Sequence, residues 1–177
     1  EKNLSWLMNS YGQGSFDFVK DDVTDLPAIT KAAVGQDVIV HLAAQVAVTT
    51  SVEDPQTDFE INARDTFNTL EAARSSNSKP VFIYASTNKV YGGLEDLQVV
   101  EENTRYMLKD QPQGIKESRG LDFHSPYGCS KGAGDQYVRD YFRIYGIPSV
   151  VFRQSCIYGP RQFGIEDQGW VAWFIIA

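Results

Sequence analysis

Continuous apolar runs alternate along this chain with stretches whose apolar residues recur at helical spacing. Residues 37–44 and 80–86 form two such runs, which are typical of strands buried on both faces of a parallel sheet. Between them, the apolar residues of 55–74 recur every three to four positions, which predicts a helix of roughly five turns.

Other segments extend this alternation. The pattern predicts strands over 16–20 and 149–153, helices over 26–33 and 127–145, and a long polar loop over 92–124. The second of these helices ends at Gly146-Ile147-Pro148, which is a helix-stop signal. Strands that alternate with helices predict an α/β fold with a doubly wound, Rossmann-like parallel sheet.

Composition limits the class of protein. The chain has 177 residues, enough for one domain with a hydrophobic core, and its 42% hydrophobic and 22% charged residues are ordinary for a soluble globular protein. A formal net charge of −7 and a pI near 4.8 argue against binding to nucleic acid or to an anionic membrane surface.

The cysteines and the two ends of the chain predict a cytoplasmic protein. Cys129 and Cys156 lie far apart without the spacing of metal ligands, so we expect intracellular thiols, no disulfide and no metal site. No basic segment followed by an apolar stretch opens the chain, so we expect no signal peptide. The apolar residues 169–177 are too few to span a bilayer, so no membrane partner is expected.

Tyr127 and Lys131 carry the main chemical signal. Positions i and i+4 share one face of a helix, so the Lys131 ammonium can lie beside the Tyr127 phenol. A phenol with a pKa near 10 is a poor base at neutral pH, and a neighbouring cation lowers that pKa. Taken alone, the pair has a second interpretation, a solvated lysine beside a half-buried tyrosine.

A hydroxyl from a separate strand end completes this chemistry. Ser86 and Thr87 precede Tyr127 by 41 and 40 residues and end a predicted strand. Either hydroxyl can hold the alcohol oxygen of a substrate while Tyr127 takes or returns its proton. This is the acid–base half of a hydride transfer, which requires a nicotinamide cofactor. Thr87 has an alternative role, ending the strand or capping a turn.

The predicted topology gathers these residues at one place. Ligands of open α/β sheets bind outside the carboxyl ends of the strands. Residues 41–45, 86–87 and 155–160 each fall at or just past a predicted strand end. We therefore expect one site at one edge of one sheet, with His41 and His124 serving structural or surface roles.

Several short motifs in order along the chain carry a family resemblance. They are Asp22-Val23, His41-Leu42-Ala43-Ala44-Gln45, Asn62, Ser86-Thr87-Asn88-Lys89-Val90-Tyr91-Gly92, Tyr127-x-x-x-Lys131 and Arg153-x-x-x-x-Tyr158-Gly159-Pro160. Together they resemble the extended short-chain dehydrogenase/reductase family, specifically its NAD-dependent nucleotide-sugar epimerases and dehydratases. Residues 155–164 and 168–174 resemble most the CDP-paratose 2-epimerases of that family.

The resemblance implies catalytic roles for three residues. Tyr127 is then the general acid/base, and Lys131 holds the nicotinamide ribose and lowers the pKa of Tyr127. Thr87 is then the hydrogen-bond partner of the reacting sugar oxygen.

It also implies a set of residues on the NAD side. Asp22 is then the acceptor for the adenine amino group, with the Val23 backbone beside it, although Asp22 has an alternative as part of a solvated acidic turn. Asn62 is assigned to the cofactor side or to packing against the sheet. The other implied cofactor-binding residues are Ala43, Ala44, Gln45, Ala85, Ser86, Ser155, Cys156 and Ile157.

The sequence departs from the family at its start. The Gly-x-x-Gly-x-x-Gly turn is absent, because Asp17 stands where Gly12-Gln13-Gly14 would need a third glycine. We therefore expect a fragment without the first β-α-β unit and without most of the C-terminal substrate domain. Residues 1–160 are then a partial NAD-binding domain and 161–177 begin the substrate-binding region. We expect the 177 residues alone to bind NAD weakly or not at all.

The implied reaction is epimerisation of a nucleotide sugar. In it, CDP-paratose becomes CDP-tyvelose through a transient 2-keto sugar, with NAD recycled, in a protein that is a homo-oligomer at full length. The alternatives are another nucleotide-sugar epimerase, a 4,6-dehydratase, or a non-catalytic nucleotide-binding Rossmann module. Asn88-Lys89 after Thr87 disfavours dehydration, because family dehydratases place Asp-Glu there.

Overall fold

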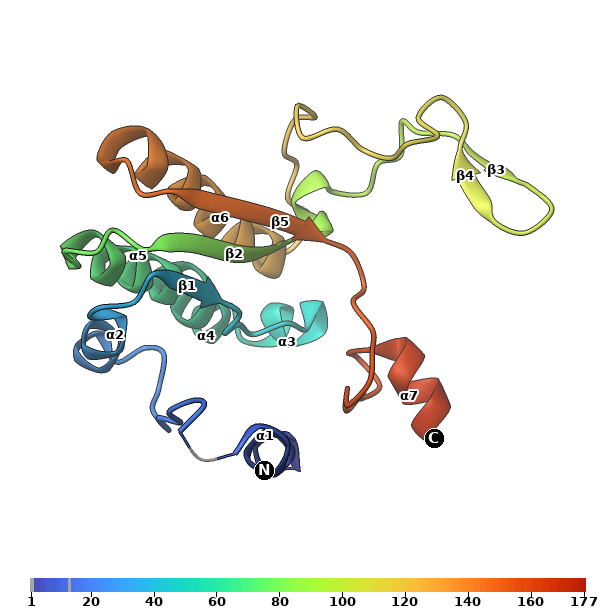
Figure 1. Cartoon of the computed structure of the whole chain (residues 1–177). Coiled ribbons are helices and arrows are strands. Elements are labelled where there is room, and N and C mark those ends of the chain that lie inside the picture. The colour runs from blue at the N-terminus through green and yellow to red at the C-terminus, as the bar shows by residue number, and fades with distance from the viewer. Residues whose placement is uncertain (1, 13) are drawn as a thin grey trace.

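Three parallel strands form the centre of the fold. The structure is a computed structural model that describes residues 2–12 and 14–177, so Gln13 of the Gly12-Gln13-Gly14 run lies outside the described residues. The strands are β1 (Val38–His41), β2 (Val81–Thr87) and β5 (Ser149–Gln154), in the order β1-β2-β5 (Figure 1). Val40, Ile83 and Val150 are register partners across the sheet. The Rossmann-like α/β prediction is confirmed.

The helix expected over 55–74 is present but changes its pitch. It runs as α4 (Pro55–Phe59), a π-helical turn η1 (Glu60–Arg64) and α5 (Asp65–Ser75). Asp54 caps its start by accepting a hydrogen bond from the Thr57 backbone N–H at 3.0 Å. Such π-turns inside α-helices are frequent at functional sites.

Helix α6 (Pro126–Tyr145) begins and ends where its sequence signals place it. The Ser125 hydroxyl accepts a hydrogen bond from the Gly128 N–H at 3.0 Å, and Pro126 occupies the first turn. Gly146 ends the helix in the left-handed conformation, at φ 68°. The predicted helix over 127–145 is thus confirmed.

Shorter elements complete the described chain. They are α1 (Lys2–Tyr11), α2 (Leu26–Ala33), α3 (Val48–Glu53), the 3₁₀ turn η2 (Asn88–Tyr91), the hairpin strands β3 (Val99–Glu101) and β4 (Tyr106–Leu108), and α7 (Trp170–Ile176). The hairpin lies inside the predicted loop 92–124 and projects away from the sheet (Figure 1). None of the described helices combines the length and apolar character that crossing a bilayer requires.

The strand predicted over 16–20 is wrong. This segment has no regular secondary structure, and Phe18 and Val19 are exposed. A strand needs a neighbour for its backbone hydrogen bonds. In the described residues none of the named strands pairs with 16–20.

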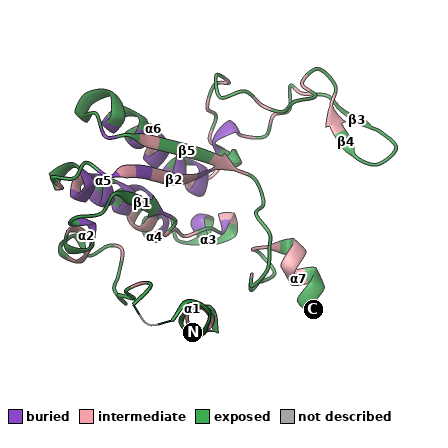
Figure 2. Ribbon diagram, viewed as in Figure 1, coloured by how far each residue is buried: buried purple, intermediate pink, exposed green. Residues whose placement is uncertain are grey.

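The core lies between the sheet and two helices. Its buried members come from α5, β2, α6 and the turn between α6 and β5: Leu70, Ala73, Phe82, Tyr84, Val138, Tyr141 and Ile147. Figure 2 shows the buried residues gathered on these elements. The opposite face of the sheet is open among the described residues, with Val40 and Phe152 about half exposed. The expectation of strands buried on both faces therefore holds for one face.

Candidate active site

The carboxyl ends of the three parallel strands lie at one edge of the sheet. Because β1, β2 and β5 run in the same direction, the residues that follow each strand leave the sheet on the same side. These are Ala43, Ala44 and Gln45 after β1, Thr87 at the end of β2, and Ser155, Cys156 and Ile157 after β5. Tyr127 lies in the first turn of α6, which packs on β2 and β5.

Tyr127 is buried and keeps its proton at neutral pH. Burial is the main cause that raises the pKa of its phenol, and the charge of Asp58 raises it further. A hydrogen bond with the Thr87 side chain acts in the opposite direction. The Tyr127 backbone N–H donates to the Ser51 hydroxyl at 3.2 Å, which fixes the start of α6 against α3.

Thr87 has two functions in this geometry. As the N-cap of η2, its hydroxyl accepts a hydrogen bond from the Lys89 backbone N–H at 3.2 Å, as the capping alternative anticipated. The same buried side chain lies close enough to the Tyr127 phenol to lower its pKa. A strand end and a helix start thus bring together the two hydroxyls that the sequence singled out.

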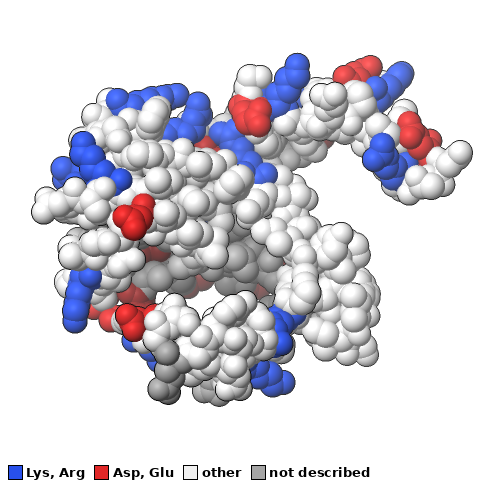
Figure 3. Space-filling view, viewed as in Figure 1, with Lys and Arg blue, Asp and Glu red and all other residues white. Residues whose placement is uncertain are grey.

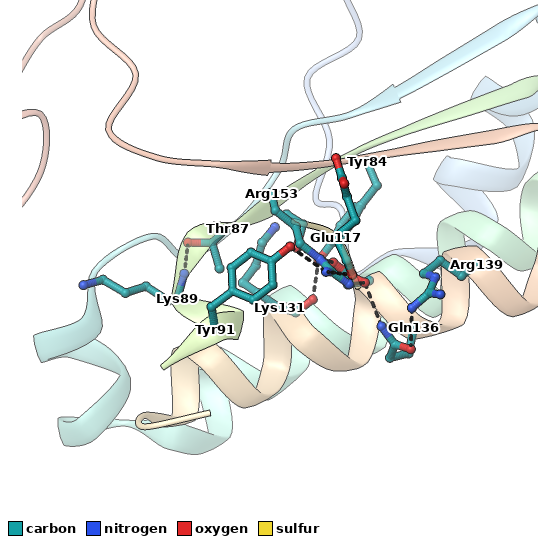
Figure 4. A network of polar contacts seen from close by, with 11 residues as sticks. Tyr84, Thr87, Lys89, Tyr91, Glu117, Lys131, Gln136, Arg139 and Arg153 are labelled. Carbon is teal, nitrogen blue, oxygen red and sulfur yellow. Dashed lines mark hydrogen bonds and ion pairs between the residues drawn. The ribbon is translucent and has the colours of Figure 1, made fainter. Parts of the chain in front are cut away.

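Lys131 lies one turn further along α6 and is 3% exposed. Its Nζ atom is 4.4 Å from the centroid of the Tyr84 ring, a cation–π contact (Figure 4). Burial lowers its pKa to about 8, against the charges of Asp58 and Asp65, which raise it. The ammonium contacts Tyr84 in this arrangement. The pKa of Tyr127 is raised, mainly by burial of its phenol, instead of being lowered by Lys131 as the sequence predicted.

A buried polar network that the sequence did not reveal lies beneath Tyr127. The Ser130 hydroxyl on α6 donates to Asp58 Oδ2 on α4 at 2.5 Å. Asn62 Nδ2 donates to Asp58 Oδ1 at 2.9 Å and to Ser130 Oγ at 3.2 Å. Asp58, Asn62 and Ser130 are each no more than 4% exposed. The only sequence signal was polar residues recurring four apart on a helix with an otherwise apolar face.

Asn62 also fixes the loop that follows β1. Its Oδ1 accepts from the Gln45 backbone N–H at 3.0 Å, and its Nδ2 donates to the Gln45 carbonyl at 3.0 Å. Gln45 Nε2 donates to Asp58 Oδ1 at 2.9 Å. The structure therefore assigns Asn62 a structural function that holds the backbone of Gln45.

A second buried network joins β2, β5 and α6. Arg153 pairs with Asp135 and donates from Nη1 to the Tyr91 hydroxyl at 2.8 Å (Figure 4). Ser86 Oγ donates to Asp135 Oδ2 at 2.9 Å. The Ser86 side chain therefore faces α6, and Ala85 alternates to the other face of the sheet, as register partner of Phe152.

Asp22 and the residues that follow β5 are exposed. Asp22 Oδ1 accepts from the N–H and the hydroxyl of Thr24, both at 2.8 Å, and these hydrogen bonds lower its pKa. Asp22 is exposed, which fits a solvated acidic turn, and its contact with the adenine amino group stays a prediction. Together with Val23, Asp22 lines a surface pocket of about 670 Å³ beside α4. Cys156 and Ile157 are exposed after β5.

Charge is unevenly distributed on the face shown in Figure 3. Acidic and basic side chains are interspersed over the β3–β4 arm, whereas the region of α7 is largely uncharged. In the part of the chain that the structure describes, no group of three or more His, Cys, Asp or Glu side chains is arranged to hold a metal ion.

Comparison with known proteins gives consistent matches over nearly the whole chain. The model described as "NAD dependent epimerase/dehydratase family" matches residues 3–177. CDP-paratose 2-epimerase of Salmonella typhi is 53% identical over 174 residues, covering 97% of this chain and 51% of that protein. A putative UDP-glucose 4-epimerase of Methanocaldococcus jannaschii is 34% identical over 160 residues, which cover 90% of this chain and 47% of that protein.

Solved structures share this fold. Pal from Bacillus thuringiensis superposes with a TM-score of 0.79 at 28% identity, covering 99% of this chain and 50% of that one. The NAD complex of the UDP-glucose 4-epimerase from Thermus thermophilus gives a TM-score of 0.72 at 31% identity, and the match covers 93% of this chain and 50% of that one. The chain spans about half the length of the curated relatives it matches.

Proposed function

Because the chain belongs to the NAD dependent epimerase/dehydratase family, we propose that it supplies the proton-transfer site of a nucleotide-sugar epimerase. The proposed reaction converts CDP-paratose to CDP-tyvelose at C2. The observation that carries the proposal is the clustering of three buried residues at the carboxyl edge of the sheet: Thr87 at the end of β2, Tyr127 in the first turn of α6, and Lys131 one turn along the same helix. The 53% identity to a CDP-paratose 2-epimerase supports the choice of sugar nucleotide.

The edge of the sheet suits NAD as the cofactor. Ala43 and Ala44 carry small side chains that allow close approach of a ligand to the backbone, and Asn62 holds the next residue in place. Lys131 would hold the nicotinamide ribose, and the residues after β5 would border the nicotinamide. When bound, NAD supplies the hydride acceptor at C2 and the hydride donor for the return step.

Tyr127 would move the proton of the C2 hydroxyl. With its pKa raised by burial, the phenol in this structure is protonated and suited to donate to a keto oxygen. To act as a base it must lose this proton, and the Lys131 ammonium is the cation on the same helix that favours the phenolate. The Thr87 hydroxyl would orient the sugar oxygen toward Tyr127.

Two further proposals concern the organisation of the protein. We propose that residues 1–160 serve the cofactor and the proton transfer and that 161–177 begin the substrate-binding region. We also propose that the complete enzyme is a cytoplasmic homo-oligomer that binds a CDP-sugar.

The test uses a chimera in which this chain replaces the matching 174 residues of the Salmonella typhi epimerase. The chimera is incubated with NAD and, separately, CDP-paratose, UDP-glucose and dTDP-glucose, and the sugar ring protons are followed by NMR. We expect the C2 epimer of CDP-paratose, lost in Tyr127→Phe by a factor of about 10² or more. Tyr137→Phe, an exposed tyrosine on the same helix, is the control and should retain activity. Epimerisation of another nucleotide sugar alone would reject the substrate, and full activity of Tyr127→Phe would reject the assigned acid/base.

A further inference from the structure

The Tyr84 side chain makes two separate contacts with Lys131 (Figure 4). Its hydroxyl donates to the Lys131 backbone carbonyl at 3.3 Å, and its ring centroid lies 4.4 Å from Lys131 Nζ. Tyr84 is fully buried in β2, and Lys131 is buried on α6. One residue of the central strand therefore contacts both the backbone and the ammonium of this lysine.

The other neighbours of the Tyr84 ring set its position. The ring belongs to the hydrophobic core, and the His41 ring stacks on it with centroids 5.7 Å apart and an interplanar angle of 14°. Gly134 lies three residues after Lys131 on α6 and leaves room for the hydroxyl, because an added Cβ would lie 2.5 Å from Tyr84 Oη. The Lys131 ammonium thus lies against a ring that is held on several sides.

The contact joins a cation to a neutral aromatic ring. Burial raises the pKa of Tyr84, so its phenol keeps its proton at neutral pH. Burial also lowers the pKa of His41 to about 4, so the stacked imidazole is neutral at pH 7 and does not repel the ammonium. The face of an aromatic ring is electrostatically negative, and it attracts a cation most strongly where water is excluded. The Tyr84 ring therefore offsets part of the cost of burying the Lys131 charge.

The carboxylates near Lys131 do not pair with it directly. Burial lowers the pKa of Lys131 to about 8, and the charges of Asp58 on α4 and then of Asp65 on α5 oppose this effect. None of the ion pairs found among the described residues includes Lys131. Asp58 instead accepts a hydrogen bond from the Ser130 hydroxyl. The direct contact of the Lys131 ammonium is thus with the Tyr84 ring.

We propose that Tyr84 is a positioning residue for Lys131, whose hydroxyl and ring face hold the lysine against β2 and stabilise its ammonium form. The relevance for catalysis rests on the function proposed above, in which Lys131 holds the nicotinamide ribose and favours the Tyr127 phenolate. Strand β2 then contributes to the site twice, through Tyr84, which holds the cation, and through Thr87 at its end. A tyrosine that only filled the core would not influence the charge of Lys131.

The first experiment compares Tyr84→Phe, which keeps the ring, with Tyr84→Leu, which replaces the ring by another apolar side chain. The chain is labelled with ¹⁵N-lysine, the Nζ signal of Lys131 is assigned by its loss in Lys131→Arg, and its titration is followed by NMR. We expect the acid dissociation constant of Lys131 to rise about tenfold in Tyr84→Leu, equivalent to one pKa unit. In Tyr84→Phe it should stay within a factor of about two of the parent value.

Tyr141→Leu is the matched control, because Tyr141 belongs to the same core and its hydroxyl bonds Glu71 instead of Lys131. It should leave the acid dissociation constant of Lys131 unchanged. Equal constants in folded Tyr84→Leu and Tyr84→Phe, or an equal rise in Tyr141→Leu, would overturn the proposal.

A measurement on the unaltered chain keeps the test open if Tyr84→Leu fails to fold. Protons that lie over the face of an aromatic ring resonate upfield, so the ε-methylene protons of Lys131 should lie upfield of those of exposed Lys89. Lys131 signals at the position of the Lys89 signals would contradict the contact. Both measurements omit NAD and substrate. An inactive chimera would therefore reject the proposed function without affecting these results, so the two proposals can fail separately.

Discussion

Arg153 on β5 and Asp135 on α6 form a bidentate ion pair, with Nε and Nη2 donating to the two carboxylate oxygens at 2.8 and 2.9 Å. Asp135 also accepts from Ser86, the residue before Thr87, and lies one helical turn beyond Lys131. The pair therefore connects the strand end that carries Thr87 with the helix that carries Tyr127 and Lys131. The spacing of the proposed catalytic groups depends on it.

Arg153→Met should destabilise the fold strongly, because it leaves the buried Asp135 carboxylate without its cation. Removing one partner of a buried pair costs about 3–5 kcal/mol. Arg143→Met is the control, since the Arg143–Asp140 pair is exposed and is worth about 1 kcal/mol or less. Urea denaturation measures both free energies of unfolding. Similar small losses in the two variants would contradict a structural role for the Arg153–Asp135 pair.

Ser130→Ala should weaken the contact between α4 and α6. The hydroxyl of Ser130 donates to buried Asp58, and loss of a hydrogen bond to a charged group costs about 1.5–3 kcal/mol. Ser75→Ala is the control, because Ser75 is an exposed helical serine whose hydroxyl donates to the Glu71 backbone carbonyl. This change should alter the free energy of unfolding by no more than about 0.5 kcal/mol. The two urea midpoints give the comparison, and equal midpoints would show that the Asp58 network contributes little.

Gly134→Ala should be destabilising although it lies within a helix. An added Cβ would lie 2.5 Å from Tyr84 Oη, so the Tyr84 ring must shift, and overpacking of this kind costs about 1–3 kcal/mol. At Gly128 on the same helix the nearest atom is 3.4 Å away, so Gly128→Ala should gain up to about 1 kcal/mol from helix propensity. Thermal melts of both variants test this, and a Gly134→Ala protein that melts above the parent would show that Tyr84 has room to move.

Asp65 and His41 should have opposite effects on how the free energy of unfolding depends on pH. The pKa of Asp65 is raised to about 7, so its contribution to stability is present at low pH and lost as pH rises from about 4 to 7. The pKa of His41 is lowered to about 4, so its contribution is lost as pH falls below about 6.5. Between about pH 4 and 7 the free energy of unfolding therefore falls with pH through Asp65 and rises with pH through His41, and the two effects oppose each other in the parent chain.

Asp65→Asn removes the contribution to stability that falls as pH rises, and it leaves the contribution of His41, which rises with pH. We expect the free energy of unfolding of this variant to rise more steeply with pH between about 4 and 7 than that of the parent. Urea titrations at a series of pH values measure the two slopes, and Asp140→Asn, at an exposed position on α6, is the control. Parallel profiles for Asp65→Asn and the parent would contradict the raised pKa of Asp65.

The sequence was sufficient for the elements whose signals are local. Helix α6 has its serine cap, its proline and its glycine stop within the segment itself, and the β2 run is long and apolar. The prediction of a strand over 16–20 was wrong because a strand needs a neighbouring strand for its backbone hydrogen bonds. In the described residues no strand pairs with this segment. The β3–β4 hairpin was missed because its short strands lie within a polar segment.

The buried charges could not be predicted from the sequence. Asp58 and Ser130 are 72 residues apart, and Ser86 and Asp135 are 49 apart, so only the tertiary fold brings them together. In the sequence each aspartate has the pattern of a solvated helix residue. By contrast, Thr87, Tyr127 and Lys131 could be proposed from the sequence because chemistry restricts the residue types that can share such a site.

We propose that this chain supports epimerisation by oxidation and reduction at C2, with Tyr127 moving the proton. The most direct test supplies the chimera with CDP-paratose that carries deuterium at C2 and follows the label by NMR and mass spectrometry. We expect CDP-tyvelose that retains the deuterium at C2, with none released to water, and no product from Tyr127→Phe. Release of the deuterium into water during epimerisation, or product formation by Tyr127→Phe, would contradict it.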